Sequence, residues 1–443
     1  MAAPAPPESS AEDDPTSSPN YRWYALALLT TVYVINFVDR QILSILLQPI
    51  KVAFDVSDTA MGFLVGFSFA IFYATLGIPI AMWADRSNRR NIIAVALAIF
   101  STMTALCGVV TSFFQLAIAR IGVGVGEAGT SPPSHSIIAD LFSPHERATA
   151  LGIFAVGVNL GIMIGFFAGG WLEEVYGWRV AFLAVGLPGL VLALIVQIFL
   201  REPLRGLSEG RSAESAAEAP PLEDAVRLFA ANRTLRNIAI GGGLNSFVGY
   251  GSVNWFPTFL IRSYDMNSSD IGMILALIIG LGGGLGTFGA GFLADRFAQH
   301  DIRWNLWLPP VLFLSAFPLN IAVFLSTDAS TSLWYYVIPA VVGTVYLAPA
   351  LAMVQTLVPL RMRTVASALL LFVINMIGMG LGPQAVGVLS DLLVDRYGDE
   401  SVRYALMIAS FMLIWSGAHF VMAARTLRED LARARAAAAA HAG

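Results

Sequence analysis

The feature that most constrains this chain is a series of apolar runs, each long enough to cross a lipid bilayer as a helix. Such a helix needs about 20 mainly apolar residues. Twelve runs of this kind occupy 21–47, 59–83, 92–111, 113–138, 147–171, 179–200, 236–261, 270–294, 305–326, 332–358, 364–390 and 402–424. Charged residues make up only 13% of the 443 residues, too few to cover a soluble surface. The sequence therefore predicts an all-helical membrane protein with twelve spans.

Polar stretches divide the apolar runs into two sets of six, at 21–200 and 236–424. Residues 1–20 are rich in proline, serine and acidic residues and lack the pattern of a secretory signal, so we expect a disordered cytoplasmic tail. Residues 201–235 form a polar linker, and 425–443 a helical cytoplasmic tail. Within the linker, apolar residues recur at helical spacing over 222–230. This predicts an amphipathic helix, either lying on the membrane surface or simply solvated.

The arginines fix the expected orientation, because cytoplasmic loops of membrane proteins are enriched in basic residues. With both termini inside, the inner segments hold 19 basic residues, the outer loops hold 5, and two lie within spans. We therefore expect both termini to be cytoplasmic. Since the sequence carries no organelle signal, we expect a multi-pass protein of the cell (inner) membrane.

An internal repeat is visible in the sequence. Asp85-Arg86 follows the second run and Asp295-Arg296 follows the eighth, 210 positions later. Arg147 precedes Asn159 by 12 residues, as Arg363 precedes Asn375, with an offset of 216. Two parallel six-span halves with a substrate site between them are a known transporter architecture.

Four ionisable residues lie deep within two of the predicted spans. Asp39 and Arg40 are in the first, while Arg120 and Glu127 are in the fourth, two helical turns apart on one face. Charges at such depth are costly and mark functional sites; the alternative is a purely structural acid–arginine pair. Our hypothesis is that Asp39 and Glu127 take protons when wetted from outside, release their arginine partners, and so allow the outer side to close.

The second half carries almost no charge within its spans. Its polar or amphipathic residues, together with Asn36, are the predicted lining of a cavity: Asn245, Tyr250, Asn254, Trp255, Tyr346 and Asn375. A cavity with one charged and one apolar wall suits an amphipathic substrate, with its headgroup near Arg120. Alternatively, these helices only face lipid or each other. No histidine, cysteine and acid cluster has metal-binding spacing, and no strand precedes a glycine run, so we expect no metal, cofactor or nucleotide.

The loop after the second run contains Asp85, Arg86, Arg89 and Arg90, and its counterpart contains Asp295 and Arg296. These charges are candidates for a latch between the two halves on the cytoplasmic side, an intracellular gate; alternatively, they serve only as positive-inside anchors. The paired loops resemble motif A of the major facilitator superfamily, Gly-x-x-x-Asp-Arg-x-Gly-Arg-Arg. Ala81 and Asn88 replace the glycines of the first copy, and the second copy lacks the last two arginines.

Three further segments narrow the resemblance to the Spinster group of lipid transporters: Asn36-Phe-Val-Asp39-Arg40, Gly124-Val-Gly126-Glu127-Ala128 and Ile138-Ala-Asp140-Leu-Phe142. The likeness covers 21–424. It implies twelve helices in two six-helix bundles, alternating access, and export of sphingosine phosphates or lysophospholipids with proton coupling. By the same resemblance, Asp39 and Glu127 are protonation sites, and Arg40 and Arg120 are their partners or contacts for a substrate phosphate.

The expected function is proton-coupled transport of lysophospholipid-like or sphingolipid-like molecules, not enzyme catalysis. We expect a monomer that binds no nucleic acid. Because Asn-x-x-Asp-Arg also occurs in organic-anion symporters of the superfamily, a symporter of small organic anions is the alternative. A receptor that binds lipid without transporting it is a third possibility.

Overall fold

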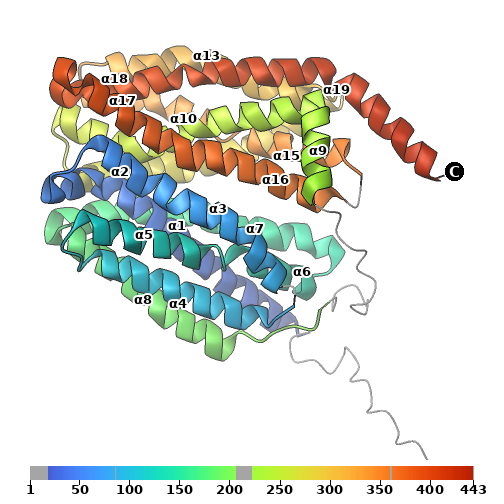
Figure 1. The fold of residues 1–443 in the computed structure, drawn as a ribbon, viewed down its shortest axis with the longest axis horizontal. Coiled ribbons are helices and arrows are strands. Elements are labelled where there is room, and N and C mark those ends of the chain that lie inside the picture. The colour runs from blue at the N-terminus through green and yellow to red at the C-terminus, as the bar shows by residue number, and fades with distance from the viewer. Residues whose placement is uncertain (1–17, 85, 206–221, 360–361, 443) are drawn as a thin grey trace, which may run out of the picture.

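The computed structural model describes residues 18–84, 86–205, 222–359 and 362–442. Its helices form two bundles that lie one above the other in Figure 1. The first bundle has six rods, each of them one helix or two consecutive helices. They are α1 (Pro19–Phe54), α2 and α3 (Asp58–Val65, Phe67–Ala84), α4 (Arg89–Cys107), α5 and α6 (Phe113–Glu127, Ser131–Leu141), α7 (Pro144–Tyr176) and α8 (Trp178–Phe199). We call the end of the molecule that carries α9 (Leu222–Ala231) the linker side, and the opposite end the distal side.

The second bundle repeats this arrangement of six rods. They are α10 (Arg233–Tyr264), α11 with a π-helical turn and α12 (Ser268–Leu275, Ala276–Leu281, Gly282–Ala298), α13 (Trp304–Leu325), α14 and α15 (Ala329–Val342, Leu347–Leu357), α16 with a second π-helical turn and α17 (Arg363–Asn375, Met376–Leu381, Gly382–Tyr397), and α18 and α19 (Ser401–Ser410, Met412–Ala442). A short 3₁₀ turn, Gly398–Glu400, precedes α18. Each of the twelve predicted runs coincides with one of these rods, and four runs (92–111, 179–200, 305–326 and 332–358) pass the end of the helix by one to four residues.

The outer surface of both bundles is apolar. Phe114, Phe288, Trp334 and Leu392 are each more than 70% exposed, which suits contact with lipid tails and not with water. Nine helices or joined helices in the described part of the chain are long and apolar enough to cross a membrane. One of the nine, the stretch 363–434, contains two rods. The rods α10 and α5–α6 are not among the nine, and adding them gives twelve rods in total.

The internal repeat is visible in the backbone at the same offset of 210 as in the sequence. Both α1 and α10 end at an aspartate with positive φ, Asp55 (50°) and Asp265 (51°), a conformation that aspartate tolerates better than most residues. The next helices begin at matching caps, since Ser57 accepts from the N–H of Ala60 and Asn267 accepts from that of Asp270. The two bundles are therefore structural repeats.

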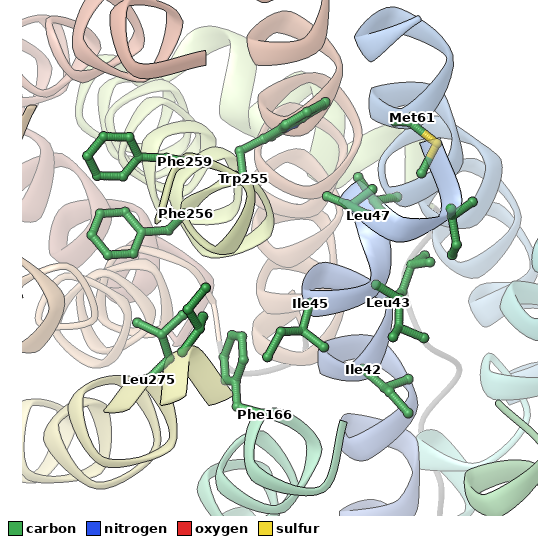
Figure 2. Close-up of a cluster of buried hydrophobic side chains, with 14 of the residues drawn as sticks. Ile42, Leu43, Ile45, Leu47, Met61, Phe166, Trp255, Phe256, Phe259 and Leu275 are labelled. Carbon is green, nitrogen blue, oxygen red and sulfur yellow. The ribbon is translucent and has the colours of Figure 1, made fainter. Parts of the chain in front are cut away.

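Apolar side chains form one core in each bundle and a third core between them. The shared core lies on the distal side, where Figure 2 shows Ile45 and Phe166 of the first bundle pointing toward Leu275 of the second. All three of these side chains are fully buried. The bundles are therefore joined by continuous apolar packing at their distal ends.

The predicted amphipathic helix exists as α9, which crosses the linker side of the second bundle (Figure 1). Its Ala225 is fully buried and Phe229 is 7% exposed, and both join the core of that bundle. The expectation that this apolar face meets the membrane is wrong for these two side chains, because the bundle covers them.

The backbones of the two bundles approach closely where α7 meets α11. A Cβ on Gly170 would lie 2.1 Å from the backbone oxygen of Ser268, and a Cβ on Gly272 would lie 2.3 Å from that of Phe166. Glycine thus permits backbones of the two bundles to touch on the distal side.

We expect Gly170→Ala to push α7 and α11 apart, because the added methyl meets backbone atoms that cannot rotate away. Overpacking of this kind costs about 1–3 kcal/mol. Spin labels on the distal ends of α7 and α11 would then report longer distances. Gly152→Ala on the same helix is the matched control, because nothing lies within 4 Å of its Cβ position. Equal distances in the two variants would contradict this account.

Candidate functional site

The four ionisable residues singled out in the sequence form two buried ion pairs within the first bundle. Arg120 donates from Nη1 to Asp39 Oδ2 at 2.7 Å, and Arg40 donates from Nε to Glu127 Oε1 at 2.7 Å. The Arg40 side chain is 12% exposed, and those of the other three are at most 3% exposed. Because two acids face two arginines, the net charge of this group is zero, which lowers the cost of burying it.

Helix geometry explains which acid meets which arginine. Adjacent residues on a helix point about 100° apart, so Asp39 faces α4 and α5 while Arg40 reaches the end of α5. Thr104 on α4 also donates to Asp39 Oδ1 at 2.8 Å, so hydrogen bonds hold both oxygens of this carboxylate. The Oε2 atom of Glu127, in contrast, is buried with no hydrogen-bond partner among the described residues.

The fourth span is broken beside Glu127. The helix α5 ends at this residue, and α6 begins at Ser131. The corresponding span of the second bundle is broken between α14 and α15, where Asn245 donates to the backbone oxygen of Gly343 at 2.9 Å. Interrupted membrane helices of this kind surround the binding sites of many transporters.

Aromatic rings surround the guanidinium of Arg40. Its Cζ lies 4.9 Å from the ring centres of Phe37 and Phe69 and 4.7 Å from that of Tyr73, close enough for cation–π attraction. Tyr250 of the second bundle also interacts with Arg40. The second bundle therefore reaches the ion pairs at Arg40.

The structure places the other predicted lining residues in different surroundings. Asn36 is buried and donates to Thr130 at 2.6 Å, while Asn254 accepts from Ser44 at 2.9 Å across the bundles. The indole of Trp255 donates to the Pro383 backbone at 2.8 Å inside the shared core. Tyr346 is 7% exposed in the core of the second bundle, and Asn375 ends α16 half-buried. In this conformation Trp255 and Tyr346 pack inside these cores, and a lining role for the predicted residues stays a prediction.

The predicted intracellular gate lies on the linker side. Arg89 is buried, pairs with Asp140 and donates to Glu202 at 2.6 Å, both within the first half of the chain. The Glu202 carboxylate also accepts from the Arg90 backbone at 3.0 Å. Arg205 donates to the backbone oxygens of Ala84 and Ser87, each at 2.8 Å. The start of the linker is therefore fastened to this loop.

The other residues predicted for the intracellular gate are Asp85, Arg86, Asp295 and Arg296. Arg86 and Arg296 are exposed, Asp85 lies outside the described residues, and so does the side chain of Asp295. Beyond the second copy, Asp301 accepts from Arg303 at 2.9 Å and from Arg428 at 3.0 Å. The hydrogen bonds from Arg303 lower the pKa of Asp301. A latch between the halves stays a prediction.

A polar cluster on the distal side was not predicted. Asp58 is 2% exposed and accepts from Arg262 of the second bundle at 2.7 and 2.8 Å. It also accepts from Lys51 at 2.6 Å and from Ser390 at 2.7 Å. Asp391 of the second bundle accepts from the backbone N–H groups of Asp58 and Thr59, and so caps α2. We call these five charged and polar side chains (Lys51, Asp58, Arg262, Ser390 and Asp391) the distal latch.

Known proteins resemble this chain along nearly its whole length. An MFS-type efflux pump of Mycolicibacterium smegmatis is 35% identical over 94% of this chain and 96% of its own. The human protein spinster homolog 1 is 26% identical over 94% of this chain and 83% of its own. The crystal structure of a bacterial homolog of the human lysosomal transporter Spinster, inward-facing and unoccupied, matches with a TM-score of 0.86 and 33% identity. It covers 93% of this chain and 99% of that one.

A family model agrees with these relatives, the twelve rods and the two repeats. The model described as Major Facilitator Superfamily matches residues 29–383, from within α1 to the start of α17. The chain belongs to the major facilitator superfamily of membrane transporters, and within that family it resembles Spinster.

Proposed function

We propose that this protein is a proton-coupled transporter of amphipathic lipids, lysophospholipid-like or sphingolipid-like, that works by alternating access. We place it in the cell (inner) membrane with both termini cytoplasmic. One observation carries the proposal: both buried acid–arginine pairs lie in the first bundle, and the second bundle faces them with the uncharged Tyr250. This asymmetry suits a molecule with a charged headgroup and an apolar tail.

The pairing of each buried acid with an arginine supports proton coupling. Protonation of Asp39 or Glu127 removes a negative charge and leaves an arginine free to bind an anionic headgroup. Here both pairs are formed while the distal latch is closed. That combination is expected after protons have left toward the linker side. One charge crossing about 100 mV is worth about 2.3 kcal/mol, enough for a roughly 50-fold substrate gradient.

The test is flux in proteoliposomes under an imposed pH gradient, with a labelled lysophospholipid inside. We expect the gradient to drive movement of the lipid, and Glu127→Gln to remove the effect because its side chain cannot exchange a proton. Glu146→Gln is the matched control, since that carboxylate pairs with Arg22 outside the site. The competing functions predict different results: a labelled dicarboxylate that moves in place of the lipid indicates an organic-anion symporter, and lipid binding without flux indicates a receptor.

A further inference from the structure

Two oxygen atoms beside the ion pairs are buried and have no hydrogen-bond partner among the described residues. They are Oδ1 of Asn36 and Oε2 of Glu127. Both residues are at most 1% exposed. An unpartnered acceptor in such a place is costly and calls for an explanation.

The orientation of the Asn36 amide is fixed by Thr130. The Thr130 hydroxyl donates its one hydrogen to the backbone oxygen of Glu127 at 2.8 Å. The Asn36 atom that lies 2.6 Å from that hydroxyl must therefore be a donor, which makes it the amide nitrogen. The amide oxygen is the atom left without a partner.

Helix geometry places Asn36 on the face of α1 that meets Glu127. Arg40 follows Asn36 by one helical turn and contacts the Glu127 carboxylate at 2.7 Å. Two other buried acceptors nearby lack partners but face elsewhere: Gln41 packs against Gly165 on α7, and Ser101 packs against Gly189 on α8. Asn36 is therefore the acceptor suited to Glu127.

We propose that Asn36 is a positioning residue for the coupling proton: when Oε2 of Glu127 is protonated, its O–H donates to Oδ1 of Asn36. The inference rests on the proposed proton coupling and deepens it by naming the atom that bears the proton and the atom that receives its hydrogen bond. While Glu127 is ionised, Arg40 donates to its other oxygen, Oε1. In the ionised form, Oε2 carries no hydrogen, so neither Oε2 nor Oδ1 of Asn36 has a hydrogen-bond partner among the described residues.

The charged and titratable groups around Glu127 come from four helices. They are Tyr33, Asp39 and Arg40 on α1, Tyr73 on α3, Arg120 on α5 and Tyr250 on α10. Asn36→Leu changes none of these groups, so a shift in the pH response of that variant reports on the acceptor itself.

The experiment measures the distance between distal spin labels on the two bundles as a function of pH. We expect Asn36→Leu to move the midpoint of the response about one pH unit toward acid, a tenfold loss of proton affinity. In a Glu127→Gln background the same change should have no effect. If Asn36→Leu does not fold, Asn36→Ala replaces it. A second readout is the infrared C=O band that Glu127→Gln abolishes, which should shift in the Asn36 variant.

Thr130→Val is the matched control, because it breaks the same Asn36–Thr130 hydrogen bond and keeps the amide oxygen. A merely structural role for Asn36 predicts equal midpoints in the two variants, and that result would overturn the inference. So would a wild-type midpoint and an unshifted band in Asn36→Leu. If the wild-type protein itself shows no pH response, the proposed proton coupling fails, which is a distinguishable outcome.

Discussion

Replacing Asp58 by asparagine should open the distal side of the protein. This variant keeps the shape of the side chain but leaves Arg262 and Lys51 without their shared counter-charge. Removing one partner of a buried ion pair costs about 3–5 kcal/mol, close to the roughly 5.5 kcal/mol that reverses a 99:1 equilibrium. Since the cost is paid only while the latch is closed, spin labels on the distal ends of α2 and α17 should report a large population of longer distances.

The control for Asp58→Asn is Ser390→Ala, which removes one hydrogen bond to the same carboxylate and no charge. We expect it to change the distance distribution far less. If Asp58→Asn retains the distal distances of the wild type, the latch does not hold the bundles together.

Replacing Asp39 by asparagine should lock one conformation and abolish the response of the distal side to pH. The change leaves the Arg120 guanidinium, which is 3% exposed, without an acid at a cost of about 3–5 kcal/mol. Since asparagine cannot exchange a proton, we also expect gradient-driven transport to fall roughly 100-fold. A change of this size corresponds to about 2.7 kcal/mol of free energy. Distance measurements across a pH titration check the conformational effect, proteoliposome flux checks the loss of transport, and thermal unfolding checks the loss of stability.

The double variant Asp39→Asn with Arg120→Gln separates stability from coupling. It restores charge balance in the pair, so we expect thermal stability to recover while the pH response stays absent. A wild-type pH response in Asp39→Asn alone would show that this carboxylate is not a coupling site.

Hydrophobic runs were sufficient to predict the twelve rods. Lipid offers no hydrogen-bond partners, so an apolar segment that crosses a membrane must satisfy its own backbone groups by forming a helix, whatever its neighbours are. The observed ends differ by several residues in places. For example, α1 reaches Phe54 and not residue 47. That difference matters, because it places Lys51 on a helix, where it faces Asp58, and not in a loop.

The pairing of charges could be predicted only in part. Spacing placed Arg120 and Glu127 on one face, but the choice of Asp39 for Arg120 depends on how α1 is rotated against α5. The distal latch was not predicted, because Lys51 and Arg262 are two of the five basic residues that the charge count assigns to the outer loops. A possible signal was Ser57-Asp58, since a serine followed by an acid is typical of a helix start and places Asp58 at a membrane boundary.

The apolar core shared by the two bundles (Figure 2) makes their separation sensitive to heat. Where opening lets water reach Ile45, Phe166 and Leu275, the heat capacity of the protein rises. The enthalpy of the conformational change then varies with temperature, and the attraction that holds the core weakens on cooling. The balance between the two conformations is therefore a curved function of temperature.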